Sequence, residues 1–168
     1  MMSRDMRRVL LLLPCNQCVR LGDYSLCDGW KIVKAYVGDL VSAGLVNLGA
    51  VDSCKPGVVL HGDELKYSWC DIAPYWDKVY SKDLERLEVL IEALAKDLKE
   101  LSLRYTAIAT YINVKAYRIA VLEASKRSNV SITDLSPSLM SPLSFRSKKN
   151  LEKLRRALLE LTYLHSFA

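Results

Sequence analysis

Two cysteines spaced C-x-x-C, Cys15 and Cys18, directly follow a short apolar run that ends at Pro14. A dithiol at the end of a buried strand is the arrangement that thioredoxin-like oxidoreductases use, with a helix N-terminus lowering the thiol pKa. The residues after Cys18 do not form a clear amphipathic helix, and the nearest approximation to a facing Thr-x-Pro-like segment is Lys55-Pro56-Gly57. Thiol or redox chemistry at these two cysteines is therefore kept as an alternative function.

A zinc site would need two ligands beyond this cysteine pair. The candidates are Cys27, Cys54, Cys70 and His61. No second C-x-x-C or C-x-x-H pair is present, so we expect these cysteines to be small, partly buried apolar residues. We accordingly predict neither a metal nor a cofactor.

Aromatic rings alternate with acidic residues over residues 57–77, a stretch that also contains His61. Such a loop is suited to a nucleobase, because Trp69 or Tyr75 can stack on its face. The carboxylate of Asp71 can accept the N–H donors of a guanine-like edge. The alternative is that the rings simply pack the loop onto the sheet.

Positive charge is concentrated in the last third of the chain. Residues 1–100 carry 13 basic against 15 acidic residues, whereas residues 101–168 carry 11 against 4. This asymmetry favours a polyanionic partner such as tRNA or another nucleic acid, although a solvated basic helix face would look the same. The cations expected to contact phosphates are Arg118, Lys126, Arg127, Lys148, Lys149, Lys153, Arg155 and Arg156.

Apolar periodicity divides the chain into alternating strands and helices. The expected strands are 8–13, 45–51, 105–112 and a short one at 130–135, and the expected helices are 28–43, 82–103, 114–125 and a last one that Ser147 or Asn150 caps. Residues 53–77 are expected to be irregular. This alternation predicts a three-layer α/β/α fold around a mostly parallel sheet. Ligands should then bind beyond the strand C-termini, in segments 15–27 and 53–77 and just after Ile112.

The 168 residues are divided into an α/β core at 1–135, a Ser/Pro-rich linker at 136–147 and a C-terminal amphipathic helix at 148–168. That helix is expected to pack either on the core or on a partner protein. The longest apolar run, Val9 to Pro14, is much shorter than the ~20 residues of a membrane span. It is also too short for a secretory signal. We expect a cytoplasmic protein without a membrane association.

In the order of these motifs, residues 8–126 resemble the core domain of archaeosine synthase, the archaeal tRNA-modifying relative of tRNA-guanine transglycosylases. The matching pieces are Leu11-Leu12-Leu13-Pro14-Cys15, Tyr24-Ser25, Ser53 with Gly57-Val58-Val59, Glu64-Leu65, and Cys70-Asp71-Ile72-Ala73-Pro74-Tyr75-Trp76. The resemblance implies a uracil-DNA-glycosylase-like α/β fold. It also implies a pocket for a purine-like base between the Pro14-Cys15 turn and the Asp71 loop.

Within this resemblance, Cys15 and Asn16 line the floor of the pocket, and Asp71, Trp69, Tyr75 and His61 complete the base-binding set. The family motif has a lysine and a histidine after the Pro-Cys turn, where this chain has Gly22 and Trp30. The resemblance therefore supports binding of a base or of RNA, and leaves the family's lysine transfer without its residues. The alternatives are the thiol protein above and a non-catalytic interaction subunit.

Overall fold

A computed structural model describes residues 8–14, 28–52, 56–60 and 82–166. Its centre is a five-stranded sheet in the order β3-β2-β1-β4-β5. The strands are β1 (Val9–Pro14), β2 (Val46–Asp52), β3 (Gly57–Leu60), β4 (Ala107–Thr110) and β5 (Thr133–Asp134). Strands β2, β1, β4 and β5 are parallel to one another. The edge strand β3 is antiparallel to its neighbour β2. The prediction of a mostly parallel sheet is confirmed.

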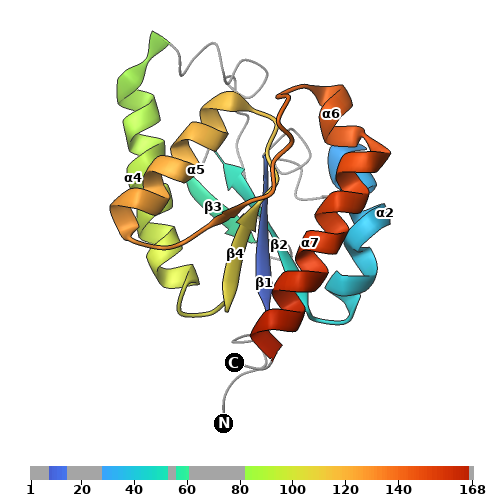
Figure 1. Cartoon of the computed structure of the whole chain (residues 1–168). Helices are drawn as coiled ribbons and strands as arrows, with labels where there is room; N and C mark the ends of the chain where they lie inside the picture. The colour runs from blue at the N-terminus through green and yellow to red at the C-terminus, as the bar shows by residue number, and fades with distance from the viewer. Residues whose placement is uncertain (1–7, 15–27, 53–55, 61–81, 167–168) are drawn as a thin grey trace.

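Helices cover both faces of this sheet, as expected for three layers. They are α2 (Asp28–Ser42), α4 (Leu84–Leu101), α5 (Lys115–Ser128), α6 (Pro142–Arg146) and α7 (Lys148–Ser166). Figure 1 shows α4 and α5 side by side on one face, and α2, α6 and α7 together on the other. All six residues of β1 are buried, because its neighbours β2 and β4 and both helical layers enclose its continuous apolar run.

Helix α4 shows why the long elements agree with the sequence. Its apolar residues recur every three or four positions, so they form one stripe that packs inward. The buried residues of α4 are Leu90, Ile91, Leu94, Leu98 and Leu101. Asp83 begins the helix by accepting the backbone N–H of Arg86 at 3.1 Å, a typical N-cap.

Two segments differ from the sequence prediction. Part of the stretch expected to be irregular is strand β3, which forms through backbone pairing with β2. Within the segment expected as a linker, residues Pro142–Arg146 form α6. Ser141 caps α6 by accepting the N–H of Ser144 at 3.1 Å, and Phe145 is buried in the core. Short elements of this kind depend on tertiary contacts that a local pattern does not contain.

Helix α7 packs on the core of its own chain, one of the two options that the sequence left open. Leu151, Leu154 and Leu158 are almost fully buried. The helix contacts α2, α6 and β1. Ser147 accepts the N–H of Asn150 at 3.5 Å, so Ser147 is the cap of this helix. Among the described helices, none is long and apolar enough to cross a membrane.

Candidate nucleic-acid interface

The carboxyl ends of β1 and β4 lie next to each other at the centre of the sheet. The chain continues from β1 to a helix on one face and from β4 to a helix on the other (Figure 1). Open α/β sheets bind their ligands at this kind of switch point. The predicted base-binding residues follow β1 or belong to 61–81: Cys15, Asn16, His61, Trp69, Asp71 and Tyr75. All six lie outside the described residues, so their convergence on one pocket stays a prediction.

The described wall of this edge is built by the segments that follow β4 and β5. The N–H of Leu135 donates to the Thr110 carbonyl at 2.8 Å, and the N–H of Ile112 donates to Ser136 Oγ at 3.0 Å. These two bonds join the end of β5 to the end of β4. The wall is therefore part of the sheet's hydrogen-bonded framework and extends beyond the short strand β5.

Tyr111 attaches α6 to the same edge. Its hydroxyl donates to the carbonyl of Phe145 at 2.7 Å, and the two ring centroids are 4.8 Å apart. Burial disfavours the charged phenolate and raises the pKa of Tyr111 to about 12, so this side chain stays a neutral donor. The contact places α6, and with it the beginning of α7, at the carboxyl side of the sheet.

An ion pair joins α5 to β5 at the same edge of the sheet. Arg118 donates through Nε to Oδ2 of Asp134 at 2.9 Å, and its Nη2 lies 2.7 Å from the same oxygen as an ion-pair contact. The other carboxylate oxygen, Oδ1, accepts the N–H of Ser136 at 3.0 Å. Burial opposes ionisation of Asp134, but the hydrogen bonds from Ser136 and Arg118 outweigh it and lower the pKa of this carboxyl. Asp134 is thus a carboxylate that orients the Arg118 guanidinium.

A cavity of about 410 Å³ opens beside this pair, between α5, the segment after β5, and α7. Its lining residues are Arg118, Asp134, Leu135, Ser136, Pro137, Ser138, Asn150, Lys153, Leu154 and Ala157. The volume falls in the ~300–1,000 Å³ range of small-molecule sites. Arg118 and Lys153, both predicted to contact phosphates, thus meet at one cavity although they come from different helices.

Two other predicted phosphate contacts are already occupied by acidic residues. Arg127 on α5 forms ion pairs with Glu88 on α4 and with Glu123. Arg155 on α7 pairs with Asp39 on α2, with contacts of 2.6 and 2.8 Å. Hydrogen bonds from the two arginines lower the pKa of Glu88 and of Asp39. These arginines therefore join helices, and neither of them lines the cavity.

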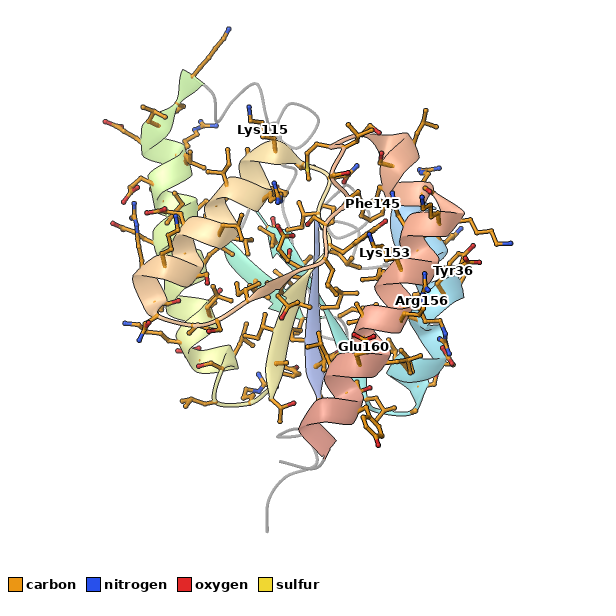
Figure 2. All side chains as sticks on the ribbon, viewed as in Figure 1. Tyr36, Lys115, Phe145, Lys153, Arg156 and Glu160 are labelled. Atoms are coloured by element: carbon orange, nitrogen blue, oxygen red, sulfur yellow. The ribbon has the colours of Figure 1, made fainter. Side chains whose placement is uncertain are left out.

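The remaining predicted cations are divided between two places. Lys126 lies in the last turn of α5, at the far end of that helix from the cavity. Lys149, Lys153 and Arg156 follow one another at helical spacing along α7, and all three are exposed. Figure 2 shows Lys153 and Arg156 on the same side of this helix. None of the three forms an ion pair with a residue in the described part of the chain. Lys148 is 3.8 Å from Glu152.

Several polar groups at this edge were absent from the predicted set. Ser136, Ser138 and Asn150 line the cavity, and Lys115 is the exposed first residue of α5. The position of Lys115 just after a predicted strand was a usable signal, since ligands bind at strand C-termini. The serines were visible as a Ser-rich segment, but their role depends on how that segment folds against α7.

The apolar stripe of α7, which the sequence offered as a surface for a partner helix, is used in the protein's own core. A second hollow lies at the other end of α7, where Leu45, Leu159 and Tyr163 are exposed. Within the described ranges, no group of three His, Cys, Asp or Glu side chains is placed to hold a metal ion.

Comparison of the chain with models of protein families, with curated proteins and with solved structures gave no match. The arrangement of side chains at the carboxyl edge is therefore the basis for assigning a function.

Proposed function

We propose that this chain binds nucleic acid, such as tRNA, at the carboxyl edge of its sheet. The observation that supports this proposal is the meeting of Arg118 and Lys153 at one cavity, next to the exposed cations of α7. Arginine forks and lysine ammonium groups are the usual phosphate contacts of nucleic-acid-binding proteins. The finer assignment to a uracil-DNA-glycosylase-like fold belongs to the same proposal, and the mostly parallel sheet supports it.

The basic stripe of α7 would follow the sugar–phosphate backbone. Lys149 and Arg156 are seven residues apart, which is roughly 10 Å along a helix. Lys153 lies between them and also reaches the cavity. A purine-like base would enter the neighbouring pocket predicted between the Pro14-Cys15 turn and the Asp71 loop. The proposal concerns binding, because the lysine and histidine of the tRNA-modifying enzymes that the sequence resembles are absent from the corresponding motif.

Salt dependence of tRNA binding tests this function. Each phosphate that the protein neutralises releases its condensed counterions. It contributes about −0.7 to −0.9 to the slope of log K against log salt concentration. The double variant Lys149→Gln/Lys153→Gln should bind more weakly and have a slope that is shallower by about 1.5. The matched control is Lys96→Gln/Lys99→Gln, which removes the same charge from exposed positions on α4. Absent or salt-independent binding of every RNA and DNA tested would refute the proposal.

Thiol chemistry remains the alternative that the sequence raises, through Cys15 and Cys18. A reactive dithiol needs at least one thiol whose pKa lies well below the ordinary value of ~8.5. Titration of the two thiols by alkylation rate against pH decides this point. If both thiols have the ordinary pKa, the redox function is refuted, and the proposal of nucleic-acid binding is unaffected.

A further inference from the structure

We infer that the cavity between α5 and α7 binds the phosphate of a nucleoside monophosphate. This inference rests on the proposed nucleic-acid function and names the chemical group that the site recognises. The ligand can be a free mononucleotide or the 5′-phosphorylated end of an RNA strand, since both present the same phosphomonoester. The argument depends on the charge, the donors and the apolar surface of this one cavity.

The charge of the cavity favours an anion. Arg118 and Lys153 bring two positive charges, and among the described lining residues the only carboxylate is that of Asp134. That carboxylate is already bound by Arg118 and Ser136. A phosphomonoester carries a charge of about −1.5 to −2 at pH 7, more than a backbone phosphodiester. The first turn of α7, next to Asn150, contains no acidic residue that would repel it.

Arg118 is held in an orientation that leaves donors available. Its guanidinium has five N–H groups, and the hydrogen bond to Asp134 uses the one on Nε. Nη2 is also in contact with this carboxylate, so the two N–H groups on Nη1 are the donors that remain for a ligand. Because Asp134 immobilises the side chain, phosphate binding would cost little further rotamer entropy. The exposed Ser138 hydroxyl and the Lys153 ammonium add donors from the other walls.

The remaining lining is apolar, which distinguishes a nucleotide from inorganic phosphate. Leu135, Pro137, Leu154 and Ala157 contribute hydrocarbon surface beside the cations. Small-molecule sites commonly combine such a surface with a few placed polar groups. A ribose or base can cover the apolar part while the phosphate reaches Arg118 and Lys153. The site therefore suits an amphipathic monoester better than a free phosphate ion.

Calorimetric titration of the full chain with guanosine monophosphate, guanosine and inorganic phosphate tests the site. We expect the monophosphate to bind at least tenfold more tightly than either of the other two. Lys153→Gln should weaken monophosphate binding by roughly ten- to a hundredfold, the value of one hydrogen bond to a charged group. Ala157→Met fills part of the cavity with no change in charge and only a small change in helix propensity. This variant should weaken monophosphate binding by a similar factor. Lys99→Gln on α4 is the matched control, and thermal unfolding checks that every variant is folded.

Equal binding of guanosine and its monophosphate would overturn the inference, as would equal effects of Lys153→Gln and Lys99→Gln. Oligoribonucleotides with a 5′-phosphate or a 5′-hydroxyl distinguish the two sources of ligand. A preference for the 5′-phosphate that Lys153→Gln abolishes assigns the site to RNA ends. Monophosphate binding without RNA binding refutes the proposed function and assigns the site to free mononucleotides. Salt-dependent RNA binding without recognition of any monophosphate refutes only the inference.

Discussion

Replacing Gly57 with alanine should destabilise the fold through Asp97, a residue on α4. Gly57 begins strand β3 with a φ of 132°, a conformation that residues with a Cβ rarely adopt. An added Cβ would collide with the Asp97 carboxylate. That carboxylate accepts the N–H of Val58 at 2.8 Å, and so satisfies a backbone donor of the edge strand. The two residues therefore form one structural unit.

The magnitude follows from two separate costs. Backbone strain at a position of this kind is about 1–3 kcal/mol. Loss of a hydrogen bond to a charged group is about 1.5–3 kcal/mol. Gly57→Ala should lower the free energy of unfolding by the sum of the two costs, about 2.5–6 kcal/mol, because the carboxylate must move away from Val58. Asp97→Ala should lose the hydrogen bond without adding backbone strain at Gly57. In the double variant the hydrogen bond is lost once, so its cost falls short of the sum of the single variants by about 1.5–3 kcal/mol.

Urea unfolding followed by circular dichroism measures all three variants, with equal slopes confirming that the same transition is compared. Gly38→Ala on α2 is the control, because an added Cβ there meets nothing within 4 Å. That change should stabilise the protein by about 0.5–1 kcal/mol, as is usual for glycine within a helix. Additive costs in the double variant, or no loss in Gly57→Ala, would refute the reasoning.

Three further outcomes are expected. Tyr111→Phe removes the hydroxyl that donates to the Phe145 carbonyl. The free energy of unfolding in urea should fall by about 1–2 kcal/mol, and no change would contradict the role given to this bond. Leu158→Ala, at a fully buried position of α7, should lower stability by about 2–5 kcal/mol within a single transition; a separate transition for α7 would show that it is not part of the core. The pKa of Asp134 is lowered in the folded state, so its stabilisation is complete above the ordinary value of about 3.9 and is lost as the pH falls through the folded-state value. The stability difference between the wild type and Asp134→Asn should therefore shrink below about pH 4, and a constant difference would contradict this assignment.

The long elements could be read from the sequence with small errors at their ends. The helix predicted at 82–103 is α4, Leu84–Leu101, and the strand predicted at 8–13 is β1, Val9–Pro14. Their patterns are local, so the chain itself contains the signal. Strand β3 and helix α6 were missed because each has only four or five residues. Strand β3 pairs with β2, and α6 is attached by the hydrogen bond from Tyr111, which follows β4, to the Phe145 carbonyl; both contacts are distant in the sequence.

The candidate site was predictable in part. Composition identified Arg118 and Lys153 as cations that could meet phosphate, but with equal weight it identified Arg127 and Arg155. The structure separates them by position: Arg127 and Arg155 pair with acidic residues on neighbouring helices and do not line the cavity, whereas Arg118 lines it although it pairs with Asp134. Lys153 has no such neighbour among the described residues. Of these acidic neighbours, only Glu123, four residues before Arg127 on the same helix, could be read from the local sequence.

The sequence by itself determined the alternation of strands and helices, the mostly parallel sheet that follows from it, and the basic character of the last third of the chain. Only the tertiary structure decided which cations are neutralised and which face a cavity. The physical reason is distance: a hydrogen bond or ion pair requires contact within a few ångströms. Arg155 and Asp39 are 116 positions apart in the chain and make contacts of 2.6 and 2.8 Å. Arg118 and Lys153 line one cavity only because α5 and α7 fold toward the same edge of the sheet.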